Sequence, residues 1–242
     1  MIPIYDDNPA LGRPVLTIAI IAGCILLWFW QISLGPVSER EAIMNFGLVP
    51  SAFLGNTFQN GPIAPLFTVF TSMFMHGGLM HLGGNMLYLW IFGDNIEGAL
   101  GHTRFLFFYL ICGIAAALAQ VFVDPTSNIP MIGASGAVSG VLGAYLIFYP
   151  RARVRTLVFL GIFITFLRLP AVFLLGVWII GQVISAMLSS PGSPGVAWFA
   201  HLGGFGCGLI LGPLMKKRDM QVFQPARTKV KEKPIRIRFR NK

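Results

Sequence analysis

The sequence predicts an all-α polytopic membrane protein, built as a bundle of six transmembrane helices with both termini in the cytoplasm. Hydrophobic residues make up 55% of the 242 residues and charged residues only 11%, whereas a soluble domain usually carries about 25% charged residues. The apolar residues occur in long runs, and one crossing of the hydrocarbon core needs about 20 helical residues. The chain length therefore suits one membrane domain, and the composition excludes a soluble one.

The first span is expected at residues 15–34, after a short polar lead that contains Pro9 and Pro14. A long loop that is rich in proline, residues 35–66, follows it. Part of this loop is apolar, as at residues 46–49, which is unusual for a solvated linker. We therefore expect the loop to lie partly in the membrane interface.

Charged residues bound the next two spans. Residues 79–96 form the second span, which ends near Asp94 and Glu97. The third span, residues 104–123, begins at Arg104. Charges at these boundaries suit the polar edges of a bilayer, because charged side chains are costly at its centre.

The fourth, fifth and sixth spans are expected at residues 135–149, 169–188 and 198–215. Pro150 stops the fourth helix, and Pro170 lies in the first turn of the fifth, where proline is tolerated. The apolar residues 156–167 have no clear assignment, and we interpret them as an interfacial loop.

The basic residues determine the orientation of the six spans. If the N-terminus is cytoplasmic, 17 of the 18 lysines and arginines lie on the cytoplasmic side, and only Arg40 lies outside. Cytoplasmic loops carry such an excess of positive charge. The protein is therefore expected in the cell (inner) membrane, with its second, fourth and sixth spans beginning at the extracytoplasmic side.

The chain is expected to divide into a cytoplasmic lead (1–14), a membrane domain (15–215) and a basic cytoplasmic tail (216–242). We expect the tail to be disordered, because it is polar and strongly charged. A basic segment next to the last span is typical of contact with anionic lipid. Nucleic acid is therefore not expected as a partner.

Polar residues inside a bilayer are costly and mark functional sites. The sequence has a set of them at the outer, N-terminal ends of three spans: His76, His81 and Asn85 of the second, Ser135 of the fourth and His201 of the sixth. A random distribution would scatter such residues over both sides of the membrane. The pattern therefore predicts one site near the outer side.

The fourth span is too short to cross the membrane fully. Its 15 residues, 135–149, extend about 22 Å, whereas the hydrocarbon core is about 30 Å thick. Its inner end is fixed by Pro150, so Ser135 is expected below the outer surface, in a cavity where irregular backbone is tolerated. Gly133 and Gly136 allow a tight entry into the helix, whose free N–H groups lie beside the hydroxyl.

Glycines predict that the fourth and sixth helices pack closely. Each helix carries a stripe of small residues, at positions 136, 140 and 143 and at positions 204, 208 and 212. Close packing could bring Ser135 within hydrogen-bond reach of His201, which could then act as a base for a serine nucleophile. The first lysine is Lys216 and no acidic residue lies at a suitable depth, so the sequence predicts a dyad.

His81 and Asn85 are four residues apart and share one helix face. Together with the Ser135 amide they could bind a developing oxyanion, which is worth about 10²- to 10³-fold in rate per donor. Each feature alone has a simpler explanation in helix packing. A metal site of His76, His81 and His201 is the other alternative, disfavoured because no His-Glu-x-x-His motif is present. No metal or cofactor is expected.

From residue 66 to 215 the chain resembles the rhomboid family of intramembrane serine proteases. The resemblance rests on Gly133-Ala134-Ser135-Gly136, on His201 with Gly204 and Gly208, on His76-x4-His81-x3-Asn85, and on Glu97 at the inner end of the second span. It implies a six-helix rhomboid fold and hydrolysis of peptide bonds in or near transmembrane segments. It also implies that Ser135 is the nucleophile and His201 the general base, and that His81, Asn85 and the Ser135 amide form the oxyanion hole, beside Gly133 and His76.

Two positions differ from the family pattern. Many rhomboids carry Trp-Arg in the first loop, where this chain has Phe67-Thr68. Some bacterial members place a tyrosine under the histidine ring, where this chain has Ser139. The sequence therefore identifies no residue that orients His201.

The predicted function is a serine endopeptidase that cleaves single-span membrane proteins near the outer side. One alternative is a catalytically inactive rhomboid-like protein that binds and escorts membrane proteins, although such proteins usually lack the serine or the histidine. A small transporter is another, but it predicts two related halves, which the sequence lacks.

Overall fold

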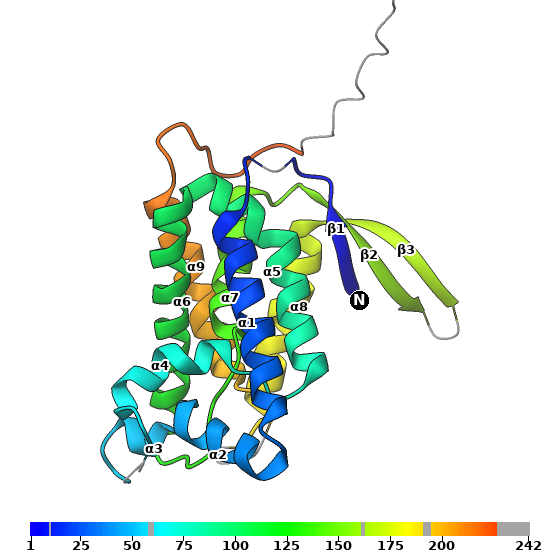
Figure 1. The fold of residues 1–242 in the computed structure, drawn as a ribbon. Coiled ribbons are helices and arrows are strands. Elements are labelled where there is room, and N and C mark those ends of the chain that lie inside the picture. Colours follow the sequence, from blue (N-terminus) through cyan, green and yellow to red (C-terminus); the bar gives the residue numbers. More distant parts are fainter. Residues whose placement is uncertain (10, 58–60, 161–162, 191–194, 227–242) are drawn as a thin grey trace, which may run out of the picture.

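The computed structural model describes the chain except for residues 10, 58–60, 161–162, 191–194 and 227–242. Its long helices form one bundle (Figure 1): α1 (Val15–Ser33), α5 (Leu79–Leu100), α6 (His102–Val123), α7 (Ser135–Phe148), α8 (Ala171–Leu188) and α9 (Trp198–Met215). By length and hydropathy, four described helices could cross a membrane: α1, α6, α8 and α9. The chain is a mostly helical, multi-pass membrane protein. The tail after residue 226 lies outside the described residues.

The six helices occupy the segments that the sequence predicted, with small shifts at their ends. The second predicted helix, α5, extends to Leu100, and the third, α6, begins directly afterwards at His102. Gly101 makes this tight turn at φ +85°, a conformation that favours glycine. The fifth predicted helix, α8, begins at Ala171, because Pro170 ends a β-strand instead of opening the helix.

The long first loop contains short helices that pack against the bundle. These are α2 (Pro36–Phe46), α3 (Pro50–Phe53), α4 (Thr68–Thr71) and two 3₁₀ turns (Pro65–Phe67 and Ser72–Phe74). The apolar patch in this loop is explained by burial, since Leu48 and Val49 are almost fully enclosed. Leu48 also pairs with Met131 through two backbone hydrogen bonds of 3.0 and 2.8 Å. This pairing joins the first loop to the segment that leads into α7.

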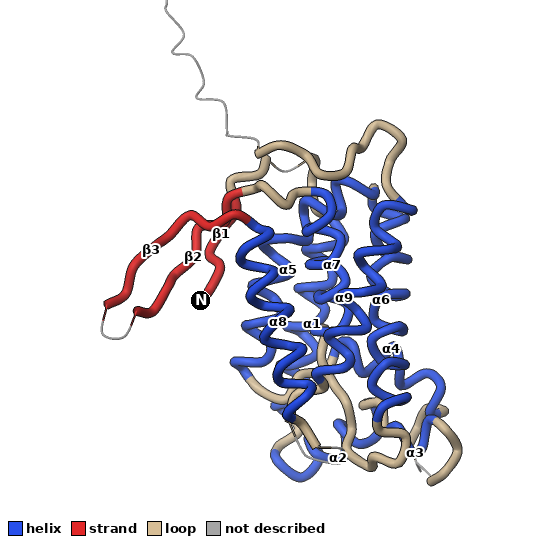
Figure 2. The backbone as a smooth tube through the Cα atoms, turned by 180° about the vertical axis from the view of Figure 1, so that it is seen from behind, coloured by secondary structure: helices blue, strands red, loops and turns tan. Residues whose placement is uncertain are grey.

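The expectation of an all-α fold is wrong in one respect, because the structure contains a three-stranded antiparallel sheet. Its strands lie in the order β1 (Ile2–Asp6), β2 (Arg153–Leu160) and β3 (Phe163–Pro170), beside α5 and α8 (Figures 1 and 2). Residues 156–167 are therefore largely strand. Their nearly continuous apolar run hides the alternation by which half-buried strands are recognised, and their partner β1 is distant in sequence.

Polar contacts attach β1 to the helices. The Asp6 carboxylate accepts hydrogen bonds from Tyr145 Oη at 2.5 Å and from Asn95 Nδ2 at 3.2 Å. Asn8 Nδ2 donates to Asn95 Oδ1 at 2.8 Å. Burial raises the pKa of the Asp6 carboxyl from its usual value of 3.8 to about 7. The N-terminal strand is thus a packed part of the fold.

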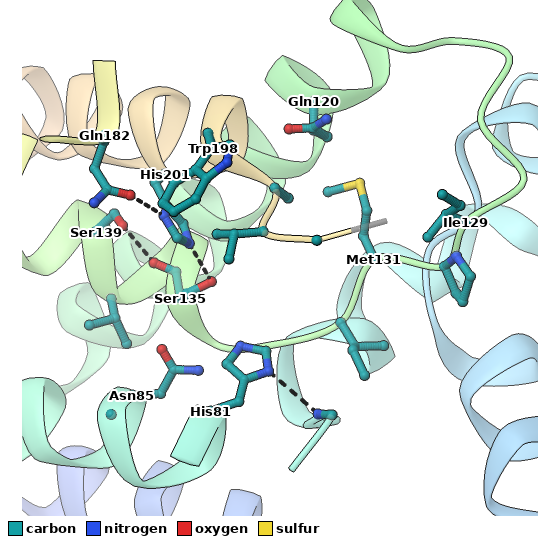
Figure 3. A pocket seen from close by; sticks show the side chains of 18 of the residues that line it. His81, Asn85, Gln120, Ile129, Met131, Ser135, Ser139, Gln182, Trp198 and His201 are labelled. Carbon is teal, nitrogen blue, oxygen red and sulfur yellow. Dashed lines mark hydrogen bonds between the residues drawn. The ribbon is translucent and has the colours of Figure 1, made fainter. Parts of the chain in front are cut away.

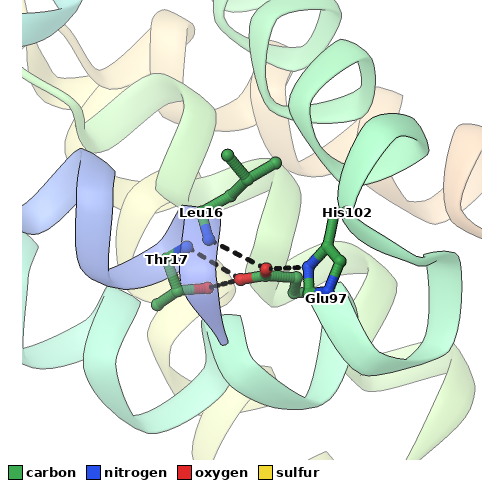
Figure 4. A network of polar contacts seen from close by, with 4 residues as sticks. All are labelled: Leu16, Thr17, Glu97 and His102. Carbon is green, nitrogen blue, oxygen red and sulfur yellow. Dashed lines mark hydrogen bonds and ion pairs between the residues drawn. The ribbon is translucent and has the colours of Figure 1, made fainter. Parts of the chain in front are cut away.

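Glu97 lies against the N-terminal end of α1 (Figure 4). Its carboxylate accepts hydrogen bonds from the backbone N–H groups of Leu16 at 2.9 Å and Thr17 at 2.7 Å, and from the Thr17 hydroxyl at 2.7 Å. His102 Nδ1 lies 2.5 Å from the same carboxylate. Since the first N–H groups of a helix have no partner within it, Glu97 satisfies the N-terminus of α1 from a different helix.

Replacing Glu97 with alanine is expected to lower the free energy of unfolding by about 3 kcal/mol, because buried N–H donors lose their acceptor. The measurement is the thermal unfolding midpoint in detergent. The control is Glu41→Ala, since Glu41 lies exposed on α2. Equal midpoints for the two variants would show that Glu97 does not stabilise α1.

The two glycine stripes bring α7 and α9 into backbone contact, as the sequence predicted. A Cβ atom on Gly204 would lie 2.0 Å from the carbonyl oxygen of Gly136, and one on Gly208 would lie 1.9 Å from that of Gly140. Further along, a Cβ on Gly143 would lie 2.3 Å from the Phe205 carbonyl oxygen. No side chain larger than hydrogen fits at these positions, so the glycines set the distance between the two helices.

Candidate active site

Ser135 and His201 face each other where α7 and α9 begin (Figure 3). His201 Nε2 lies 2.8 Å from Ser135 Oγ, within the range of a hydrogen bond. Ser135 is the first residue of α7, and His201 lies in the first turn of α9. The contact between the two helices therefore produces the pairing that the sequence predicted, and a histidine in this position can take the proton of a serine hydroxyl.

The other ring nitrogen of His201 is held by Gln182 on α8. Gln182 Oε1 lies 2.6 Å from His201 Nδ1. An amide oxygen can only accept, so this contact requires the proton on Nδ1 and leaves the Nε2 lone pair for the Ser135 hydroxyl. The sequence interpretation missed Gln182. The available signal was a glutamine within an otherwise largely apolar span.

Aromatic side chains flank His201 without the tyrosine found in some relatives. The ring centroid of Trp178 lies 6.1 Å from that of His201, and the two ring planes are tilted by 32°. The ring centroid of Trp198 lies 6.0 Å from it, and those ring planes are perpendicular at 90°. Ser139, at the position of that tyrosine, donates instead to the Ser135 carbonyl oxygen at 2.7 Å. The ring is therefore supported from α8 and from the first residue of α9.

His81 and Asn85 belong to α5, and both lie lower than Ser135 in the view of Figure 3. The Gly77 N–H approaches His81 Nδ1 at 3.4 Å, which leaves Nε2 as the protonated, donating nitrogen. Asn85 is buried, and its Nδ2 has no hydrogen-bond partner in the described part of the chain. A buried donor without a partner costs free energy, so the site contains an amide that is available to an acceptor from outside.

Gly133 brings the chain close to these two side chains. A Cβ atom there would lie 2.6 Å from His81 Nε2 and 3.7 Å from Asn85 Nδ2. Its φ of +124° is also unfavourable for any other residue. The Gly133 N–H donates to the Ser72 carbonyl oxygen at 2.8 Å. Gly133 is thus required both for the turn before Ser135 and for the space that His81 occupies.

His76 lies behind His81 and away from Ser135. It is fully buried, and its Nδ1 lies 3.2 Å from the Phe74 carbonyl oxygen. Its ring packs edge-on against that of His81, with centroids 5.2 Å apart. Among the described residues, no three His, Cys, Asp or Glu side chains are grouped so as to hold a metal ion. The two histidines are therefore in a packing contact.

Ser135, His201, His81, Asn85 and Gln182 line one cavity of about 730 Å³. Its other walls come from the segments that precede α7 and α9 and from residues of α5 and α7. Ligand cavities in proteins commonly have about 300–1,000 Å³. A short stretch of polypeptide is therefore a suitable size of ligand. His76 does not contribute to the lining.

Comparison with known proteins gives matches to one family. The family model for the rhomboid domain matches residues 64–218. The rhomboid protease GluP of Bacillus subtilis is 33% identical over 135 residues, which is 56% of this chain and 25% of GluP. The rhomboid protease AarA of Providencia stuartii is 30% identical over 154 residues, 57% of this chain and 52% of AarA.

A mitochondrial relative from Saccharomyces cerevisiae, rhomboid protein 1, is 33% identical over 105 residues, which is 42% of this chain and 30% of the relative. The chain thus matches between a quarter and about half of the length of these relatives. The rhomboid domain model, in contrast, covers most of the helical bundle, from the end of the first loop to just after α9. The chain belongs to the rhomboid family.

Proposed function

We propose that this chain is an intramembrane serine endopeptidase that cleaves peptide bonds in or near transmembrane segments of single-span membrane proteins. The observation that carries the proposal is the 2.8 Å contact between Ser135 Oγ and His201 Nε2, inside a cavity of a membrane-embedded bundle. Relatives named as rhomboid proteases support it. No metal or cofactor is needed for this chemistry.

The reaction begins when Ser135 Oγ attacks the scissile carbonyl carbon and its proton passes to His201 Nε2. The resulting tetrahedral intermediate collapses, the C–N bond breaks, and His201 gives the proton to the leaving amine. A water molecule from the cavity then attacks the Ser135 ester, with His201 again as the base. The second collapse releases the new carboxyl terminus and returns the hydroxyl to Ser135.

The oxyanion of each tetrahedral intermediate is bound by His81 Nε2, Asn85 Nδ2 and the Ser135 backbone N–H. The unpartnered amide of Asn85 supports this role, because a donor kept free in the resting protein is available when charge develops. The tautomer of His81 supports it too, since its accepting nitrogen faces Gly77. Gly133 allows the backbone to approach His81 and Asn85 closely just before Ser135.

Asn85→Ala is expected to reduce kcat by about 10²- to 10³-fold with little change in KM, because the lost interaction is made only in the transition state. Cleavage of a model transmembrane substrate in detergent measures both constants. The thermal midpoint should not fall, since the Nδ2 donor forms no hydrogen bond in the resting protein. A rise in KM with unchanged kcat would assign Asn85 to substrate binding instead.

The topology belongs to the same proposal. Six spans, formed by α1 and α5 to α9, place both termini in the cytoplasm and the cavity toward the extracytoplasmic side of the cell (inner) membrane. The positive charges support this orientation, because 17 of 18 basic residues then lie on the cytoplasmic side. In this proposal the lead is residues 1–14, the membrane domain is residues 15–215, and the tail that contacts anionic lipid is residues 216–242.

Reaction of the purified protein with a fluorophosphonate tests the catalytic assignment. We expect the wild type to be labelled on Ser135, as identified by mass spectrometry, and to cleave a model transmembrane substrate. An inactive escort protein or a transporter would give neither result. Failure of labelling and of cleavage across a panel of transmembrane substrates would overturn the proposal.

A further inference from the structure

We propose that Gln182 is the positioning residue of His201, so that the lipid-facing helix α8 holds the base in its working orientation. This inference rests on the proposed function. Its starting observation is the 2.6 Å contact between Gln182 Oε1 and His201 Nδ1. On the opposite side of the ring, Nε2 contacts Ser135. Gln182, His201 and Ser135 thus form a continuous hydrogen-bonded chain across three helices (Figure 3).

The chain of hydrogen bonds defines both the tautomer and the direction of the imidazole. A neutral histidine carries one proton, and the amide oxygen of Gln182 keeps that proton on Nδ1. If it moved to Nε2, the ring could no longer accept the proton of Ser135. Gln182 is hydrogen-bonded to His201 and not to Ser135 among the described residues, so we expect its effect to act through His201.

An amide is a different partner from the carboxylate of a serine protease triad. During attack on the carbonyl, His201 becomes a cation and its Nδ1–H becomes a stronger donor. A neutral amide oxygen stabilises that cation through a dipole only, whereas a carboxylate would attract it with a full charge. The glutamine therefore orients the ring while leaving the basicity of His201 lower than a carboxylate would make it.

A second residue of α8 holds the same ring. Trp178 precedes Gln182 by four residues, so both side chains lie on one face of the helix. The Trp178 ring lies 6.1 Å from His201, and it also packs against Phe205 of α9 at 6.0 Å. The Trp178 and Gln182 face of α8 therefore fixes the ring at two points, one aromatic and one polar.

α8 itself is weakly packed. Only 22% of its residues are buried inside the protein. Its buried residues are Ala171, Leu174, Leu175 and Ala186, which leaves the turn around Gln182 without a fully buried apolar anchor. Nothing lies within 4 Å of a Cβ placed on Gly176 or Gly181. The orientation of His201 thus depends on a turn of α8 that has few buried neighbours in the described part of the chain.

Two substitutions of Gln182 test this role. Gln182→Leu removes the acceptor and keeps an apolar residue of similar length. We expect kcat and the rate of Ser135 labelling by a fluorophosphonate to fall by about 10- to 100-fold, by analogy with the loss when the hydrogen-bond partner that orients a metal-bound histidine is removed. KM should change less than about threefold, because Gln182 acts through His201 rather than through bound substrate.

Gln182→Glu keeps the acceptor and adds a charge. It should preserve labelling, and it should move the acid limb of the kcat/KM profile to higher pH by about one unit or more, because a neighbouring carboxylate favours the imidazolium. The other titratable residues that line the cavity, His81, Tyr88 and Asp124, are unchanged in this variant. A merely structural glutamine would not produce such a shift.

Gln221→Leu is the matched control, because it makes the same substitution at an exposed residue after α9 that does not line the cavity. We expect it to label like the wild type. If Gln182→Leu also labels within threefold of an active wild type, and Gln182→Glu leaves the pH profile unchanged, the positioning role is wrong while the protease assignment stands. An unlabelled wild type would instead overturn the protease assignment itself.

Discussion

Alanine in place of Ser135, of His201 or of both will reduce cleavage to the same residual level, about 10⁴- to 10⁶-fold below the wild type. The reason is that the two residues act as a unit across their 2.8 Å contact. A serine without its base remains a weak nucleophile, and a base without the serine has no proton to take. The losses in the single variants should therefore not add in the double variant.

The measurement is single-turnover cleavage of a model transmembrane substrate by the three variants. Ser139→Ala, one turn further along α7, is the control for loss of a serine hydroxyl and should keep at least about a tenth of the activity, because its hydroxyl bonds only to a backbone carbonyl that helical N–H groups also satisfy. Additive losses in the double variant would show that Ser135 and His201 act independently.

Gly208→Ala is expected to lower the free energy of unfolding by about 3 kcal/mol or more and to abolish labelling of Ser135. The added methyl group would lie 1.9 Å from the Gly140 carbonyl oxygen. Overpacking against a flexible side chain costs about 1–3 kcal/mol, but here the neighbour is backbone and the two helices must separate. Separation of α7 from α9 would also separate Ser135 from His201, the proposed nucleophile and base.

Gly206→Ala provides the matched control for this experiment. Gly206 lies two residues earlier in the same helix, and nothing lies within 4 Å of a Cβ placed there. Since alanine is a better helix former than glycine, this variant should be as stable as the wild type or slightly more so. Thermal unfolding in detergent and the labelling rate compare the two variants. Similar midpoints would show that the glycine contact does not set the distance between α7 and α9.

Much of the candidate site could be predicted because its residues follow helical spacing. His81 and Asn85 occupy one face of α5 at a separation of four residues. The glycine stripes indicated that α7 and α9 approach closely, and that approach brings Ser135 to His201. His76 was grouped with these residues because it completes the His-x4-His-x3-Asn pattern, but its side chain packs against His81 and does not line the cavity.

Gln182 could not be assigned from the sequence. Helical spacing shows which residues of α8 share a face, but not which neighbouring helix that face contacts. In the structure, the face with Trp178 and Gln182 meets the first turn of α9. The same difficulty applies to the sheet, where β1 pairs with β2 although about 150 residues separate them. Pairing over such a distance leaves no local signal in either strand.

The sequence by itself determined the membrane class and the positions of the long helices, and it named Ser135 and His201 as candidates for a nucleophile and its base. These depend on hydropathy, on proline and glycine, and on helical periodicity, which are local properties of the chain. Only the tertiary structure decided what holds the base, where His76 points and that the N-terminal segment completes a sheet. These depend on contacts between segments distant in the chain, and such contacts are set by the packing of whole elements.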